Sequence, residues 1–100
     1  MGYLNLNSGT IQNFSVSQVA ESSDLIVVHV TIDTDLGTTK YRICEDTRAT
    51  IKDIINDFNN GLNTAKSSDA DFYINEYQER DYIFVTFPNG ETKQYTAKRI

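Results

Sequence analysis

The residues best suited to chemistry in this chain are its single histidine, His29, and its single cysteine, Cys44. They fall on neighbouring predicted strands, so some strand registers would bring them together as a cysteine nucleophile with a histidine base. Such a pair needs further groups to orient it, and the sequence places none beside it. We therefore expect both to be half-exposed sheet residues, and we expect no catalytic residues.

Oxygen ligands are offered by Asp33 and Asp35, together with the Thr31 and Thr34 hydroxyls. The spacing and the final glutamate of an EF-hand are absent, so a plain acidic turn is the better interpretation. The chain has no phosphate-binding glycine loop and no HExxH, CxxC or GxSxG motif. A lone cysteine also rules out an internal disulfide and a cysteine-based metal site. We expect no metal and no cofactor, and binding is favoured over catalysis.

Acidic residues outnumber basic ones by fourteen to nine, which gives a net charge of −5. This balance disfavours direct binding to nucleic acid, because phosphates require clustered positive charge. Each acidic group is either a solvated surface or a patch that binds a protein partner with a basic surface. The two groups are Glu21, Asp24, Asp33 and Asp35, and then Asp69, Asp71, Glu76, Glu79 and Asp81.

Tyrosines are numerous on the predicted strands. They could form cross-strand pairs at the margin of the core. They could also form an interface, since tyrosine is enriched where one end of a side chain stays wet. Those on or next to predicted strands are Tyr41, Tyr73, Tyr77, Tyr82 and Tyr95.

The element that must organise these side chains is a helix predicted over residues 47–62. Thr50 and Asp53 have the spacing of a capping box, and Thr47 is an alternative N-cap. The stretch 59–61 (Asn-Asn-Gly) supplies the residue types of a helix C-cap, and 63–68 is expected to be a loop. One face of the helix is apolar and requires a sheet to cover it. Its residues are Ile51, Ile54, Ile55, Phe58 and Leu62.

Strands are predicted on both sides of the helix. Those over 13–19, 25–32 and 38–44 form an antiparallel meander, with 25–32 as the central strand of the sheet because both of its faces are largely apolar. Those over 72–77, 82–87 and 92–97 follow the helix, the last two as a hairpin around a Pro-Asn-Gly turn. The stretch 72–77 could instead be helical or irregular.

The predicted fold is α+β, a single domain over residues 1–100 with one helix packed on one face of an antiparallel sheet. Residues 1–12 are expected to be a loosely held lead-in. No apolar run has the length of a membrane span, and no signal peptide is visible. The sequence therefore predicts a soluble cytoplasmic protein that does not bind a membrane.

Residues 25–73 resemble the small acidic anti-CRISPR proteins that inhibit type II effector nucleases. The similar features begin with an apolar strand at 25–30 and an acidic turn that closes on Gly37. They continue through the helix and end at an acidic residue followed by Phe72-Tyr73. The other matching positions are Tyr41, Ile43, Glu45, Ile51, Ile54, Ile55, Phe58, Asn60, Gly61 and Asn63.

This resemblance implies a non-enzymatic inhibitor, encoded by a mobile element such as a phage and acting in the host cell. Its carboxylates would stand in for DNA phosphates and occupy the DNA-recognition groove of the nuclease. The chain departs from the family at 64–68, which holds Lys66 and no carboxylate, and in the strands after residue 77. The partner-binding positions so indicated are Asp33, Asp35, Glu45, Asp69 and Asp71, to which we add Tyr73.

A second resemblance is topological. A hairpin, a helix and a further strand also begin a ubiquitin-like β-grasp, which implies an adaptor module. The diglycine tail of conjugated modifiers is absent, since the sequence ends Lys98-Arg99-Ile100. A small α+β structural module that associates with itself through an exposed edge strand is a related alternative. The sequence leaves the oligomeric state open.

Overall fold

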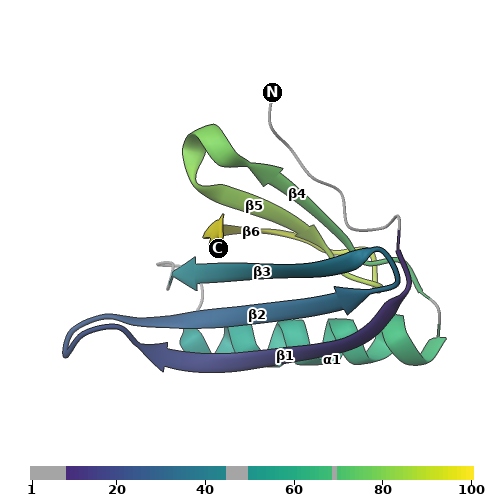
Figure 1. The fold of residues 1–100 in the computed structure, drawn as a ribbon, viewed down its shortest axis with the longest axis horizontal. Helices are drawn as coiled ribbons and strands as arrows, with labels where there is room; N and C mark the ends of the chain where they lie inside the picture. The colour runs from purple at the N-terminus through teal and green to yellow at the C-terminus, as the bar shows by residue number, and fades with distance from the viewer. Residues whose placement is uncertain (1–8, 45–49, 69) are drawn as a thin grey trace.

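The computed structural model describes residues 9–44, 50–68 and 70–100. Six strands form one antiparallel sheet in the order β1-β2-β3-β6-β5-β4, and α1 packs against one face of it (Figure 1). The predicted α+β class, with one helix on one face, is confirmed. The elements are β1 (Ile11–Ala20), β2 (Ile26–Thr34), β3 (Gly37–Cys44), α1 (Ile51–Ser68), β4 (Tyr73–Tyr77), a 3-10 helix (Gln78–Arg80), β5 (Tyr82–Thr86) and β6 (Thr92–Arg99).

The sheet consists of two meanders, β1-β2-β3 and β4-β5-β6, which meet where β3 pairs with β6. This junction is short, running from Tyr41 opposite Arg99 to Ile43 opposite Ala97. β2 is therefore the middle strand of the first meander only, and the centre of the sheet is formed by β3 and β6. The prediction that 25–32 would be the central strand was wrong, because apolar residues on both faces of a strand report burial and carry no information about how the two meanders join.

The helix begins at Ile51, directly after the predicted capping residue Thr50, and ends later than predicted; the alternative N-cap, Thr47, lies outside the described ranges. The capping box is present, since the Asp53 N–H donates to Thr50 Oγ1 at 3.2 Å. Beyond the predicted C-cap at 59–61, α1 continues to Ser68, so residues 63–68 form helical turns instead of a loop. Gly61 is buried in the middle of the helix, where a Cβ atom would lie 2.7 Å from Phe87 Cδ1. The glycine permits close packing here, and the helix does not terminate at it.

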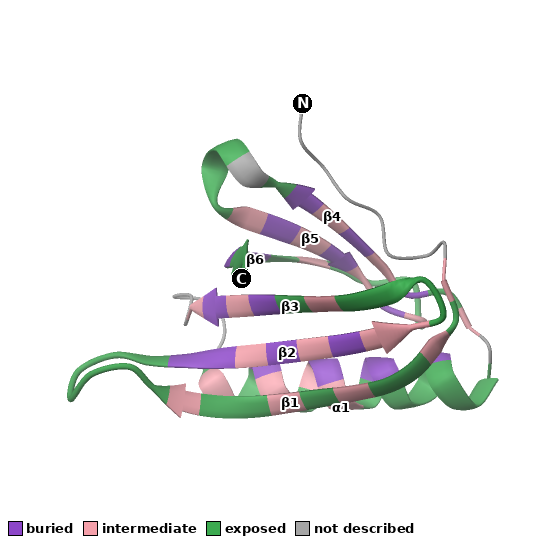
Figure 2. Ribbon diagram, in the orientation of Figure 1, coloured by how far each residue is buried: buried purple, intermediate pink, exposed green. Residues whose placement is uncertain are grey.

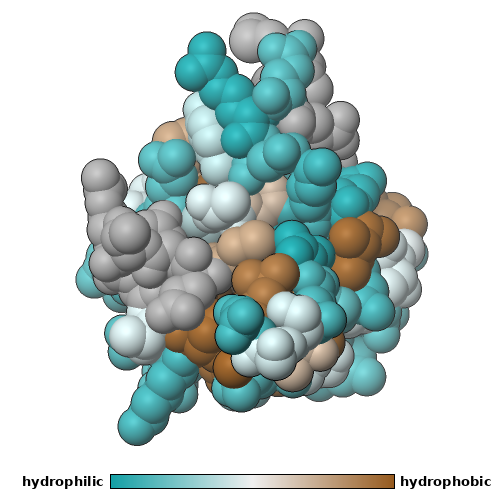
Figure 3. Space-filling view, turned by 90° about the vertical axis from the view of Figure 1, so that its left-hand side faces the viewer, coloured by the Kyte–Doolittle hydropathy of each residue, from teal (hydrophilic) through white to brown (hydrophobic). Residues whose placement is uncertain are grey.

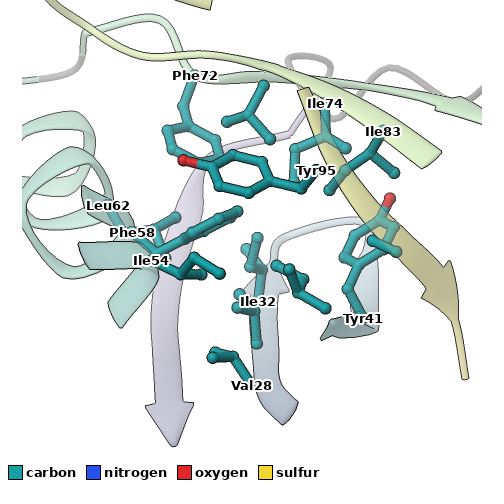
Figure 4. Close-up of a cluster of buried hydrophobic side chains, with 14 of the residues drawn as sticks. Val28, Ile32, Tyr41, Ile54, Phe58, Leu62, Phe72, Ile74, Ile83 and Tyr95 are labelled. Atoms are coloured by element: carbon teal, nitrogen blue, oxygen red, sulfur yellow. The ribbon is translucent and has the colours of Figure 1, made fainter. Parts of the chain in front are cut away.

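The core lies between α1 and the inner face of the sheet (Figure 4). Phe58 is its central side chain, with the Phe87 ring at 5.8 Å in an edge contact and the Tyr95 ring at 5.3 Å in a tilted one. Figure 2 shows buried residues along the helix face that meets the sheet and on alternate positions of the strands. Fully buried side chains from α1 and from both meanders meet here, including Val28, Ile32, Tyr41, Ile54, Leu62, Ile74 and Ile83.

The remaining predicted segments agree with the structure in outline. Residues 73–77 form strand β4, which settles the conformation of a segment whose sequence was ambiguous. β1 begins at Ile11, so the end of the expected lead-in is part of the sheet, and residues 1–8 lie outside the described ranges. Gly90 in the turn between β5 and β6 has φ 91°, as the Pro-Asn-Gly signal predicts. None of the helices described has the length and apolarity needed to cross a bilayer.

Candidate functional site

The acidic turn between β2 and β3 is held by hydrogen bonds to its carboxylates. Asp33 Oδ1 accepts a hydrogen bond from Thr38 Oγ1 at 2.6 Å. Asp35 Oδ1 accepts one from the backbone N–H of Thr10 at 2.8 Å, which ties the turn to the start of β1. Each carboxylate is thereby fixed in position by a neutral donor, which orients it and leaves its charge in place.

No ion pair involves Asp33, Asp35 or Asp71 within the parts of the chain that the structure describes. Charges of this kind remain available to a partner. Within the described ranges Asp24, Asp53 and Glu79 likewise have no ion pair, whereas the other carboxylates there are neutralised by a nearby cation. The neutralised ones pair as Glu21–Arg42, Asp57–Lys93, Glu91–Lys93, Glu76–Arg99 and Asp81–Lys98.

These three aspartates lie toward the same end of the molecule. Figure 1 shows the β2–β3 turn, the C-terminal end of α1 and the connection to β4 at one end of the long axis. Asp71 is exposed in that connection, and Asp35 is exposed at the turn. We call Asp33, Asp35 and Asp71 the acidic end. The other two predicted acidic residues, Glu45 and Asp69, lie outside the described ranges.

The described members of the second acidic group do not form a continuous surface. Glu76 is only 2% exposed and points to the inner side of the sheet, where its Oε2 lies 3.0 Å from Arg99 Nη2. Asp81 Oδ1 lies 3.6 Å from Lys98 Nζ. Strand alternation turns Glu76 inward, so residues adjacent in sequence are separated onto different faces.

Tyr73 belongs to an aromatic surface on the face of the sheet opposite α1. Tyr77 and Tyr82 are cross-strand partners with ring centroids 5.0 Å apart, and Phe84 lies 5.3 Å from Tyr82. Tyr73 shares their face by register, and we call these four residues the aromatic face. From the sequence, Tyr73 was predicted to bind a partner, an interface was one of two alternatives for Tyr77 and Tyr82, and Phe84 was missed. The alternation of Tyr82 and Phe84 with the apolar residues 83 and 85 was the signal that could have placed Phe84 on the same face.

His29 and Cys44 lie on the same outer face of the sheet. Arg42 is the neighbour that both of them contact. His29 pairs across strands with Arg42, whose Nη1 donates to Cys44 Sγ at 3.2 Å. Arg42 Nε also donates to Glu21 at 2.7 Å, and this hydrogen bond lowers the pKa of the Glu21 carboxyl. Both His29 and Cys44 are half-buried, as predicted. The contacts at Cys44 are thus with a guanidinium, which cannot act as a general base.

A cavity of about 390 Å³ lies between α1 and the β5–β6 turn. Lys93 Nζ lies 2.8 Å from Asp57 Oδ2, and this hydrogen bond raises the pKa of Lys93. Glu91 also approaches Lys93, at 3.8 Å. The charged groups of this cavity therefore pair with one another.

Comparisons with protein-family models, with curated proteins and with solved structures gave no match to this chain. Across the described residues, His, Cys, Asp and Glu side chains form no group of three or more that could hold a metal ion. The acidic end and the aromatic face are the candidate binding surfaces of this protein.

Proposed function

We propose that this protein is a non-enzymatic inhibitor that binds a basic surface of another protein through its acidic end. Following the family resemblance, we propose that the partner is a type II CRISPR effector nuclease and that the acidic end mimics DNA in its recognition groove. The observation that supports this most directly is the set of three carboxylates at one end, with no ion pair among the described residues.

Carboxylates suit this role because arginine guanidinium groups bind carboxylate and phosphate oxygens with the same planar fork. The hydrogen bonds from Thr38 and Thr10 fix two of the carboxylates before binding, which lowers the ordering cost of association. Opposite charges also accelerate encounter, so binding should weaken as salt is raised.

The aromatic face supplies a second component of the interface. Tyrosine is enriched in the cores of protein interfaces, where its ring is buried and its hydroxyl stays hydrogen-bonded. Tyr77 is 37% exposed, and its ring already packs against Tyr82 and Phe84. In this arrangement the aromatic face provides apolar contact area and the acidic end provides orientation.

The test is neutralisation of the acidic end by Asp33→Asn, Asp35→Asn and Asp71→Asn together. Asparagine keeps an acceptor oxygen for the bonds from Thr38 and Thr10, so the turn should be preserved while three charges are lost. We expect the triple variant to lose inhibition of DNA cleavage by the nuclease. Adding Glu45→Gln extends the test to a predicted residue outside the described ranges.

A matched control, Asp24→Asn with Glu79→Gln and Asp81→Asn, removes three charges elsewhere in the molecule. Asp24 lies in the β1–β2 turn, at the other end of the long axis (Figure 1), and Asp81 has φ 54°, which asparagine tolerates. This control has the same net charge as the triple variant and should inhibit like the unmodified protein. Equal inhibition by the unmodified protein, the triple variant and the control variant would refute the role of the acidic end.

A further inference from the structure

The two edges of the sheet are built differently. β4, at one edge, is five residues long and carries the inward-pointing Glu76. Short edge strands and inward-pointing charges are devices by which natural sheets prevent pairing with other chains. β1, at the other edge, is ten residues long and contains neither a charged residue nor a proline. Its register with β2 shifts at the start, between Ile11 and Asn13, and is regular from Asn13 to Ala20. Among the described residues, the β4 edge is therefore protected along its length, whereas β1 from Asn13 to Ala20 has no such device.

The unprotected edge is also flanked by incompletely covered apolar side chains. Five partly buried hydrophobic residues pack against the core, and all come from β1 or α1. Figure 2 shows α1 running along β1 and β2, with half-buried positions on both β1 and the helix. We call this set the apolar flank. It consists of Ile11, Phe14, Val16, Ile51 and Ile55.

Apolar exposure continues at the end of the hairpin formed by β1 and β2. Leu25 is 41% exposed and Ile26 is 39% exposed. Figure 3 views the molecule from that end and shows hydrophobic surface between hydrophilic side chains. Ile26 lies opposite Ala20, the last residue of β1, so it extends the same side of the molecule.

We propose that β1 pairs antiparallel with β1 of a second copy of this chain, which joins the two sheets into one and makes the protein a homodimer. A two-fold axis crossing β1 brings each apolar flank against its counterpart, so apolar surface meets apolar surface. A different protein recognised through its charge would need charged residues on this edge. β1 contains no charged residue, although the net charge of the chain is −5.

The size of the contact is adequate for a stable dimer. A ten-residue strand is about 34 Å long, and the two layers of strand and helix are together about 20 Å thick. The side of the molecule that contains β1 and the flank of α1 then offers about 700 Å² per copy, close to the roughly 800 Å² per partner of a standard interface. Strand pairing adds backbone hydrogen bonds to this area.

The proposed dimer leaves the acidic end accessible. Ile11, at the start of β1, lies opposite Thr34 beside the acidic turn. Antiparallel pairing of two β1 strands therefore places the two acidic ends at opposite ends of the joined sheet. The dimer would be bivalent. Its existence is tested separately from the inhibitor function, because the experiment below measures the mass of the protein and not inhibition.

The experiment is sedimentation equilibrium of the full chain over a wide range of concentrations. We expect a mass of twice 11.3 kDa that falls toward 11.3 kDa on dilution. The variant Ser15→Lys with Gln18→Lys places a cation on each face of the exposed edge and should remain monomeric. The control, Gln94→Lys with Thr96→Lys, adds the same charge to exposed positions of the interior strand β6 and should dimerise.

Hydrogen exchange of the unmodified chain gives an answer that does not depend on a variant folding. Amides of β1 should be protected more strongly at high concentration than at low concentration, while those of β4 should be unchanged. A mass of 11.3 kDa at every concentration would overturn the proposal. So would dimerisation of the β1 variant, or concentration-dependent protection confined to β4.

Discussion

Gly61 was predicted to end the helix, but in the structure it lies inside the helix and allows close packing. Next to Asn59 and Asn60 it resembles a helix terminus, yet it lies on the buried face of α1. There the Phe87 ring approaches its Cα so closely that a Cβ atom would lie 2.7 Å from Phe87 Cδ1 and 3.2 Å from Phe72 Cε2. The missing side chain is what allows the helix and the second meander to pack at this distance.

We predict that Gly61→Ala destabilises the protein. Alanine improves helix propensity by about 1 kcal/mol, but overpacking a well-filled core costs about 1–3 kcal/mol. Phe87 cannot yield easily because its ring is packed between Phe58 and Phe72. The free energy of unfolding, measured with urea, should fall by about 1 kcal/mol. Asn60→Ala, at the exposed neighbouring position, is the control and should leave stability unchanged or slightly raised.

At the scale of elements, α1 is defined by its N-terminal capping box and by the length of its apolar face. The Asp53 carboxylate returns a bond by accepting from the Thr50 N–H at 3.4 Å. Leu62 and Ala65 continue the buried face past the predicted end of the helix. Local side-chain bonds thus set where the helix begins, and packing against the sheet sets where it ends.

We predict that Thr50→Ala lowers the free energy of unfolding by about 1 kcal/mol, the usual cost of losing an N-cap side chain. Thr64→Ala is the control within the same helix. Thr64 Oγ1 donates to the Asn60 carbonyl at 2.9 Å, a back-bond that contributes little to helix stability. Thermal unfolding followed by circular dichroism would compare the two, and equal midpoints would show that the cap is dispensable.

At the scale of the whole molecule, Arg99 connects parts that are distant in sequence. It lies opposite Tyr41 in the short β3–β6 ladder, and its guanidinium reaches the buried Glu76 carboxylate of β4. The side chain of Arg99 is 41% exposed, whereas that of Glu76 is 3% exposed. The pair therefore covers a buried charge at the place where the two meanders join.

We predict that Arg99→Ala lowers the free energy of unfolding by about 1–3 kcal/mol, because it leaves a buried carboxylate without a cationic partner. Lys98→Ala removes the adjacent charge, whose pairing with Asp81 is largely exposed, and should change stability by no more than about 0.5 kcal/mol. Denaturant unfolding of both variants checks this. Similar losses in the two would mean that the Glu76 site does not require its cation.

The acidic end was predicted only in part from the sequence. The sequence indicated an acidic turn at Asp33 and Asp35, because turn residue types and charges are local features of the sequence. It could not indicate which carboxylates are neutralised, since the cations that pair with Glu76 and Asp57 lie on β6. Pairing of this kind depends on strand register, which is decided by contacts between distant segments.

The sequence by itself determined the class of the fold, the start of the helix and the alternation of each strand, because these depend on side chains a few residues apart. Only the tertiary structure decided that β6 joins β3 and that α1 extends to Ser68. It alone decided that β1 and β4 are the two edge strands and that Glu76 points inward from β4. These features arise from packing between the two meanders, for which the chain order carries no local signal.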